Sequence, residues 1–382
     1  MFFQNKKVLL VSPEKWGKLR VSKHNYAIAL LTVADSVFFL NPPDLNSSVW
    51  GKVVQSEEGV FVISYKPIAR GKKFLGAIVF SFLQWVQFAV IFRFRFGKFS
   101  VVWNFDDGNY DNLNCFGADF KIYHSVDHTD DRMQSPCSKT ADIIFSTSHR
   151  ILEYQRSPGV FSSVINHGIN SVFEKNALRV RDAIKNEKID LSTKIRKVGF
   201  WGSLLKQSLD KDRILRLVEA NPDVEFVFAG PFDAKQNNLG GHDFNEIESF
   251  INKLSSYKYV KLVGPKSSSE IIETFKDVDV LINLEFQYSA RWDNGNPHKI
   301  MEYLSTGAVV FTSPMIMYQD SELVYTIEQN EDVIEKFNQL KSAFSELSSR
   351  QNRIKRIDYA LDNTYVNQIR KISLLIETEA RK

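Results

Sequence analysis

The residues best suited to chemistry lie in a loop and helix over residues 291–312. The loop is rich in Gly, Asn and Pro, and Pro297 stands near the first turn of the expected helix, where its missing N–H costs no hydrogen bond. Such a helix start presents free backbone N–H groups and a positive dipole end, which suits a phosphate. Lys299 adds a cation in the first turn. Glu302 lies three residues further on, near the same face, where a carboxylate can accept hydrogen bonds from both hydroxyls of a ribose.

Two series of short apolar runs, separated by helical patterns, must position this segment. Each run predicts a buried strand, and the alternation with helices predicts βαβ units and a parallel sheet. Two such series in one chain predict an α/β protein with two Rossmann-like domains that face each other across a cleft. The apolar runs of the first series start at Val8, Val37, Val60, Val101, Ile122, Ile143 and Val164. Those of the second series start at Lys197, Val224, Val260, Val278, Val309 and Leu323.

The domain boundaries follow from a change in composition after Asn170. Residues 171–195 are of mixed charge and lack a strong apolar run, so we expect a linker there. Residues 1–170 then form the first domain and residues 196–355 the second. The last fifty residues have a helical pattern, and we expect the helix in 356–382 to cross back to the first domain.

The stretch 296–310 resembles the donor-binding segment of GT-B glycosyltransferases, especially bacterial polysaccharide enzymes of the family-four and TuaH-like groups. It reads Asn-Pro-His-Lys-Ile-Met-Glu-Tyr-Leu-Ser-Thr-Gly-Ala-Val-Val, and about nine positions agree with that family in type and order. The resemblance implies a GT-B fold and a nucleotide-sugar donor, linked to UDP rather than GDP. It further implies transfer to a saccharide or polyprenyl-linked acceptor in bacterial surface polysaccharide biosynthesis, such as that of capsule or exopolysaccharide.

The same resemblance implies which residues hold the donor. Small residues after the first strand of the second domain let the backbone approach the diphosphate, and nearby cations balance its charge. Glu302 holds the ribose. Asn294 stands where many retaining members have a second Glu, so retention or inversion of configuration is left open. The other implied donor-binding residues are Gly202, Ser203, Lys206, Gly230, Arg291, Asn296, Pro297, His298 and Lys299.

The acceptor is expected in the first domain, together with the group that acts on it. An inverting transferase needs a base for the acceptor hydroxyl, and burial in a cleft raises the pKa of a carboxylate toward that role. Asp127 best matches the acidic position after a strand in similar enzymes, followed by His128 and then Asp107. The expected acceptor-binding residues are Trp16, Lys18 and Arg20.

We expect neither a metal nor another cofactor. The pairs at 106–107 and 130–131 have the composition of a hard-cation site, but metal-dependent Asp-x-Asp glycosyltransferases have a different architecture. The two cysteines, Cys115 and Cys137, are too few for a disulfide framework and fit a reducing compartment. The N-terminal residues do not resemble a secretory signal, so a cytoplasmic location is expected. No nucleic-acid partner is expected, since the basic surplus of the first half is local.

That surplus surrounds an apolar segment, residues 75–92, in which 14 of 18 residues are apolar. Seven Lys and Arg residues between 66 and 98 are accompanied by no acidic residue. A membrane-spanning helix would place two strands of one sheet on opposite sides of a bilayer. We therefore expect residues 72–98 to lie on an anionic membrane surface, at the inner face of the plasma membrane. A helix buried in the fold is the alternative.

Two other functions remain open at this point. A non-hydrolysing nucleotide-sugar 2-epimerase would also bind UDP between two Rossmann-like domains, although such an enzyme has no need of the basic-flanked apolar segment. A catalytically silent subunit that binds a sugar nucleotide is the other alternative, because Asn294 replaces a frequent Glu.

Overall fold

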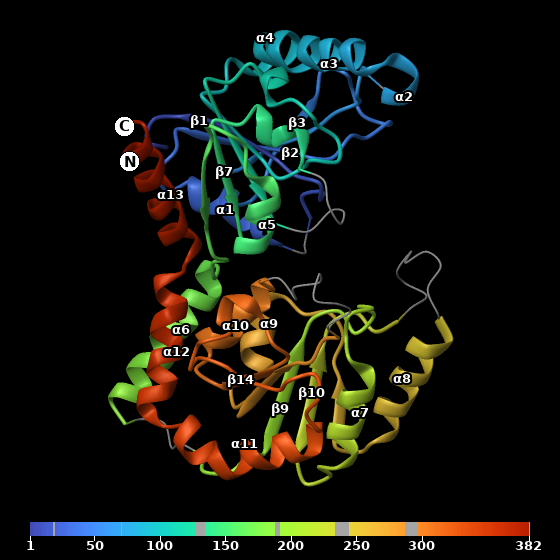
Figure 1. Ribbon diagram of the computed structural model, residues 1–382, viewed down its shortest axis with the longest axis vertical. Helices are drawn as coiled ribbons and strands as arrows, with labels where there is room; N and C mark the ends of the chain where they lie inside the picture. The colour runs from blue at the N-terminus through green and yellow to red at the C-terminus, as the bar shows by residue number, and fades with distance from the viewer. Residues whose placement is uncertain are drawn as a thin grey trace. The chain divides into compact units, whose positions relative to one another are not determined.

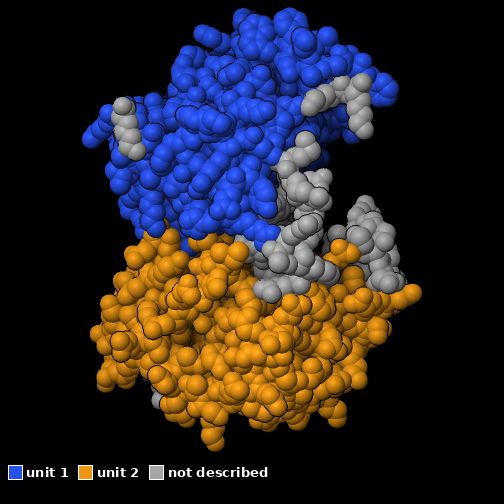
Figure 2. All heavy atoms as spheres, viewed as in Figure 1, with its two compact units in different colours: residues 1–167, 365–382 blue, residues 168–364 orange. Residues whose placement is uncertain are grey.

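The computed structural model describes residues 1–17, 20–69, 71–126, 134–187, 192–233, 244–286 and 296–381. They form two compact units, coloured separately in Figure 2. Unit 1 comprises Met1–His167 and Tyr365–Lys382, and unit 2 comprises Gly168–Thr364. Each unit contains one mainly parallel sheet with helices on both faces (Figure 1). The prediction of an α/β chain with two parallel-sheet domains and a helical C-terminal tail is confirmed.

Unit 1 has an eight-stranded sheet with the order β3-β4-β2-β1-β5-β6-β7-β8. Only β3, at the edge, runs antiparallel to its neighbour among the described strands, and its mostly exposed residues explain why no strand is predicted there. The strands are β1 (Lys7–Val11), β2 (Ser36–Leu40), β3 (Lys52–Gln55), β4 (Phe61–Ser64), β5 (Val101–Asn104), β6 (Phe120–Ser125), β7 (Ile143–Ser146) and β8 (Phe161–Val164). The helices are α1 (Ser22–Leu30), α2 (Lys72–Leu75), α3 (Ala77–Trp85), the π-helix η1 (Val86–Phe92), α4 (Arg93–Phe96), η2 (Leu113–Phe116), η3 (Pro136–Lys139), α5 (His149–Gln155) and α13 (Tyr365–Glu379).

Alternate side chains of β1 enter different cores on the two faces of this sheet. Val8 and Leu10 share a core with residues of α1 and α13, whereas Leu9 and Val11 share one with residues of η1 and η2. Both faces are thus covered, as parallel sheets require. Helix α13 packs on α1, so the C-terminal helix completes one face of unit 1.

Unit 2 has a six-stranded sheet with the order β11-β10-β9-β12-β13-β14, and the neighbouring strands run parallel. The strands are β9 (Lys197–Trp201), β10 (Glu225–Ala229), β11 (Val260–Leu262), β12 (Val280–Asn283), β13 (Val309–Thr312) and β14 (Tyr325–Thr326). The helices are α6 (Ser171–Lys185), α7 (Lys211–Glu219), α8 (Phe244–Ser256), α9 (Ser268–Thr274), α10 (His298–Ser305), η5 (Ile316–Tyr318), α11 (Val333–Leu347) and α12 (Arg350–Asp362).

The segment expected to be a linker contains a regular helix, α6. Asn170 caps its N-terminus by accepting hydrogen bonds from the amides of Val172 and Phe173. Only Phe173, Ala177 and Ile184 of this helix are buried, so the sequence shows no strong apolar run there. The helix packs against α12 within unit 2.

Candidate active site

Strands β9 and β12 are neighbours in unit 2, and the segments that follow them converge at one edge of the sheet. The carboxyl ends of adjacent parallel strands lie on the same side, which is where open α/β sheets bind ligands. Residues 208–210 and 284–286 also hydrogen-bond to each other through their backbones, and α10 begins nearby. This arrangement brings Lys206, Glu285 and Lys299 together.

Two lysines share one buried carboxylate. The Nζ of Lys206 lies 2.9 Å from both carboxylate oxygens of Glu285, and the Nζ of Lys299 lies 3.4 Å from Oε1. Ser208 donates a hydrogen bond from Oγ to Oε2 at 3.0 Å. The Nζ of Lys299 also lies 4.7 Å from the centre of the Phe200 ring. Lys206 is 47% exposed, so this cation is accessible to a ligand.

Burial and pairing set the protonation of this cluster. Burial lowers the pKa of Lys299 to about 8, although Glu285 opposes the shift. Burial alone would raise the pKa of Glu285, but Lys299, Lys206 and Ser208 together hold that pKa below its ordinary value. The carboxylate is therefore ionised at neutral pH and keeps Lys299 more protonated than burial alone would allow. The cluster carries a net positive charge that an anion can use.

Glycines at the strand ends keep the backbone close to this cluster. A Cβ on Gly230 would lie 1.9 Å from the carbonyl oxygen of Gly202, so no side chain fits at position 230. Gly202 has φ of 148°, which side chains rarely allow, and a Cβ there would lie 3.6 Å from the Nζ of Lys299. The backbone at Gly202 thus lies beside the cation, as a diphosphate site requires.

Glu302 and Trp201 form a second polar contact beside the lysines. The indole Nε1 of Trp201 donates to Oε2 of Glu302 at 2.9 Å. Burial raises the pKa of Glu302, whereas His298, the indole N–H and Lys299 favour the ionised form. The Tyr303 hydroxyl hydrogen-bonds to the backbone N–H and C=O of Trp201, at 3.1 and 3.2 Å, and fixes the end of β9 against α10.

The start of α10 has the expected geometry. Pro297 is the N-cap residue, and no side chain of the described residues caps this end. Asn296 is buried, His298 is exposed, and Lys299 points from the first turn toward Glu285. Ser203 belongs to the turn after β9, where its hydroxyl accepts a hydrogen bond from the amide of Leu205. The structure therefore brings Gly202, Lys206, Lys299 and Glu302 to one edge of unit 2.

A separate cavity of about 460 Å³ is also lined by Glu285. Its lining holds five carboxylates but only two guanidinium groups, those of Arg213 and Arg216. Arg216 is paired with Asp332, and Arg213 donates to the backbone carbonyls of residues 328, 329 and 331. Such a lining disfavours an anionic ligand, so the lysine cluster is the better phosphate site.

In unit 1, two of the expected acceptor residues contact each other. The guanidinium of Arg20 lies 4.2 Å from the centre of the Trp16 ring and forms an ion pair with Glu58 at 2.6 Å. The backbone N–H of Trp16 donates to Asn41 at 2.8 Å. Arg20 is thus already paired, and a ligand phosphate would have to compete with Glu58. Lys18 lies outside the described residues.

The acidic loop after β5 is held by its own hydrogen bonds. The carboxylate of Asp106 accepts from the amides of Gly108 and Asn109 and from the Asn109 side chain, at 2.8–3.1 Å. Asp107 is partly buried and accepts a hydrogen bond from the Tyr123 hydroxyl at 2.7 Å. Asp127, His128 and Arg291 lie outside the described residues, so their roles stay predictions.

Sequence reasoning missed Glu285, the residue that joins the two lysines. An available signal was an acidic side chain two positions after the buried run Val280–Asn283, at the carboxyl end of a strand next to β9. A carboxylate in such apolar surroundings must be paired, and Lys206 and Lys299 were already expected at this edge.

No protein-family model and no curated protein sequence matches the chain. Among solved structures, Anabaena HepE in complex with UDP and glucose is 13% identical over 98% of this chain and 100% of its own, with a TM-score of 0.63. Sucrose-phosphate synthase from Thermosynechococcus elongatus is 12% identical over 99% and 100%, with a TM-score of 0.62. The α,α-trehalose 6-phosphate synthase from Burkholderia multivorans is 10% identical over 99% and 100%, with a TM-score of 0.63. The chain therefore has the GT-B fold of these glycosyltransferases.

Proposed function

We propose that the protein is a glycosyltransferase whose donor is a nucleotide sugar, with UDP as the nucleotide. The observation that carries this proposal is the convergence of Lys206 and Lys299 beside Gly202 and the N-terminus of α10. The two cations, the backbone at Gly202 that lies beside them and the helix start without a side-chain cap together suit a diphosphate. In this proposal Glu302 accepts hydrogen bonds from the ribose. Structures of HepE with UDP and with UDP-glucose support the choice of nucleotide.

Unit 2 would act by holding the leaving diphosphate. The transition state of glycosyl transfer places negative charge on the departing nucleotide, and preorganised cations stabilise that charge. Lys299 is fixed by Glu285 and by the Phe200 ring, so little reorganisation is needed when the charge develops. Lys206 is exposed and adjusts to the ligand.

Unit 1 would supply the acceptor site and the base, with Asp127 as the first candidate. Asp107 is the described alternative, and its hydrogen bond from Tyr123 holds the carboxylate at the end of β5. Metal independence is part of the proposal. The fixed hydrogen bonds of Asp106 support it, because this carboxylate is already committed to the backbone of its own loop. Unchanged turnover in EDTA is the expected result.

The proposed acceptor is a saccharide or a polyprenyl-linked saccharide, in the assembly of a bacterial surface polysaccharide such as capsule or exopolysaccharide. The protein would then work in the cytoplasm, at the inner face of the plasma membrane. The apolar and basic segment of unit 1 supports this location.

A panel of nucleotide sugars, with and without saccharide acceptors, tests the proposed function. Release of UDP from one UDP-sugar, accelerated by an acceptor, is the expected result. Formation of an isomeric nucleotide sugar would identify an epimerase instead. Binding of UDP by calorimetry without any turnover would identify a silent binding subunit, and absence of UDP binding would overturn the donor site itself.

A further inference from the structure

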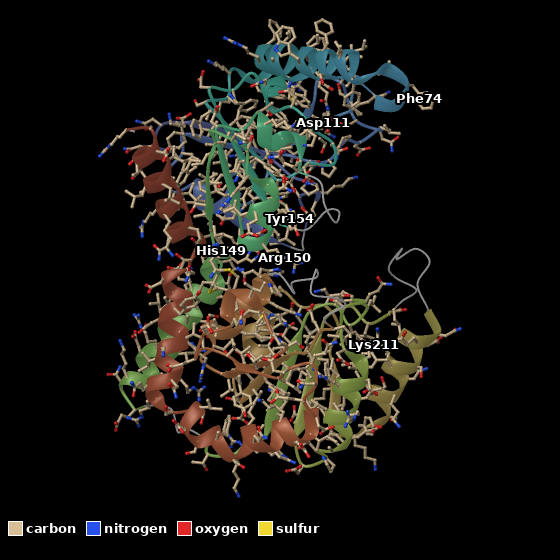
Figure 3. All side chains as sticks on the ribbon, viewed as in Figure 1. Phe74, Asp111, His149, Arg150, Tyr154 and Lys211 are labelled. Carbon is tan, nitrogen blue, oxygen red and sulfur yellow. The ribbon has the colours of Figure 1, made fainter. Side chains whose placement is uncertain are left out.

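The helical stretch of α2, α3, η1 and α4 exposes large apolar side chains on unit 1. Phe74 is 95% exposed, Ile78 is 87% exposed and Phe94 is 86% exposed. Phe82 and Trp85 are exposed on the same stretch. Figure 3 shows Phe74 projecting from α2 away from the rest of unit 1. Isolated exposed apolar residues are ordinary, but a row of this kind marks an interaction surface.

The opposite face of the stretch is anchored to unit 1. Gln87 donates to the backbone carbonyls of Val49 and Lys66 and accepts from the amide of Ile68, at 2.8–3.1 Å. Gln84 donates to the carbonyl of Asn109 at 3.0 Å. Phe88 and Phe92 lie in the core beneath the stretch. The two glutamines that interrupt the apolar segment therefore hold the helix to the sheet.

The π-helix η1 keeps the exposed residues on one face. Ile78, Phe82 and Trp85 follow one another at four- and three-residue steps, as on an α-helix. The hydrogen bonds of a π-helix span five residues and widen the turn, so the five-residue step from Trp85 to Val90 stays on that face. Phe94 follows four residues later. We call the exposed residues of this stretch the apolar row. They are Phe74 of α2 and Ile78, Phe82, Trp85, Val90 and Phe94.

Described cations border the apolar row at its C-terminal end. Arg93 and Arg95 are exposed in the last turn, and Lys98 follows, paired with Asp119. Lys72 and Lys73 stand at the first turn in the sequence. No acidic residue occurs between Glu58 and Asp106 in the sequence. An apolar face bordered by cations is complementary to an anionic lipid surface, where aromatic rings enter the interface and guanidinium groups meet headgroups.

We propose that unit 1 docks on an anionic lipid bilayer through the apolar row, with the helix lying in the interface. The stretch Ala77–Phe96 is long and apolar enough to cross a membrane, and only 22% of its 18-residue apolar window is buried in the protein, which does not fit a helix of the core. It joins β4 to β5, so a membrane crossing would place these two strands of one sheet on opposite sides of the bilayer. The helix therefore lies on one side of the bilayer. This inference does not depend on the donor site.

Flotation of the full-length protein with vesicles tests the docking. Wild type should float with mixed phosphatidylcholine and phosphatidylglycerol vesicles at physiological salt, and much less with phosphatidylcholine alone. The variant Ile78→Ser/Phe82→Ser/Phe94→Ser should lose binding by roughly tenfold or more, because these side chains no longer leave water. The matched control is Leu374→Ser, an exposed apolar position on α13, which should bind as wild type does.

A charge variant separates the electrostatic part. Arg93→Gln/Arg95→Gln should weaken binding to anionic vesicles by about 25-fold, since each cation near the surface contributes about fivefold. Arg370→Gln/Lys371→Gln, which removes two exposed cations of α13, is the control and should change little. Unchanged UDP affinity in all four variants would show that the fold and the donor site are intact.

Depth measurements identify the geometry. Trp85 fluorescence should be quenched most by lipids brominated near the headgroup, and Trp85→Phe should remove that quenching. Strongest quenching at the bilayer centre would indicate insertion and overturn the interfacial docking. Equal flotation of wild type and the triple Ser variant, or no flotation of wild type, would also overturn it. A stable wild-type dimer that the triple Ser variant converts to monomer would assign the apolar row to a second copy instead.

Discussion

The carboxyl edges of the two sheets hold their buried polar groups in opposite ways. In unit 2, Lys206 and Lys299 are charged and share the carboxylate of Glu285. In unit 1, His124 at the end of β6 is fully buried, and neither ring nitrogen has a hydrogen-bond partner among the described residues. Its ring stacks on Phe105 and Trp103, with ring centres 5.0 and 6.0 Å apart.

This difference teaches what each edge can bind. When buried cations are already paired with a carboxylate, a ligand phosphate can replace part of that pairing. No further charge of the protein then has to be removed from water. At the carboxyl edge of unit 1, the buried Asp106 carboxylate is held by amides of its own loop and His124 is stacked on aromatic rings, so neither group offers a cation to a phosphate. The contrast supports the assignment of the anionic donor to unit 2 and of the saccharide acceptor to unit 1.

The largest expected effect concerns Asp127, which follows β6 in unit 1. A general base contributes about 10²–10⁴-fold to turnover, so Asp127→Asn should lose that factor while UDP affinity stays near wild type. Steady-state kinetics together with calorimetry measure the two quantities. Turnover within a factor of a few of wild type would make Asp127 structural, and His128 and Asp107 would then be the candidates to test.

The next effect breaks the charged edge of unit 2. Lys299→Ala removes a cation that we assign to the diphosphate, and a hydrogen bond to a charged group is worth about 1.5–3 kcal/mol, roughly 10- to 150-fold in UDP affinity.

Glu302→Gln should lower the affinity for UDP but leave the affinity for pyrophosphate unchanged, because the proposed partner of Glu302 is the ribose. Calorimetry with both ligands distinguishes these roles, and unchanged UDP affinity in Lys299→Ala would contradict the donor site.

A smaller effect appears in acid and belongs to unit 1. Burial, reinforced by Lys23, lowers the pKa of His124 to about 3. The unfolded chain therefore binds a proton below about pH 6.5 that the folded chain does not, and stability falls by about 1.4 kcal/mol per pH unit on further acidification. His124→Phe should remove this contribution, about 2 kcal/mol at pH 5. Urea unfolding of both proteins at pH 7 and pH 5 measures the difference. An equal loss of unfolding free energy between these two pH values in both proteins would place the acid sensitivity at another group.

Apolar periodicity predicted most of this architecture because most strands are buried on both faces. The strands that it predicts, such as β1, β9 and β12, are continuous apolar runs. It failed where burial is sparse. Strand β3 lies at an edge with mostly exposed residues, and α6 buries only three side chains, so neither produces a strong pattern.

The site was predictable where one short segment carries it and not where it depends on pairing across the sheet. Lys299 and Glu302 lie three residues apart, so their spacing alone indicates a common helix face, and Pro297 marks the start of that helix. Glu285 is 79 residues from Lys206 and acts only because β12 lies beside β9. The roles of Trp201 and Ser208 likewise depend on which strand ends meet.

The smallest effect sharpens the contrast between a charged and a neutral edge by titrating Lys299. Its pKa of about 8 means that the ammonium is half lost at pH 8, whereas the phosphates of UDP are fully ionised above roughly pH 7. A bound diphosphate would raise this pKa, so binding takes up a proton and UDP affinity should fall by about tenfold between pH 7 and pH 9. Lys299→Ala should show no such fall. Glu285→Gln should move the fall to lower pH, because the carboxylate that raises the pKa of Lys299 is gone. Calorimetry across this pH range measures all three proteins, and a flat wild-type profile would show that the Lys299 charge does not contact the ligand.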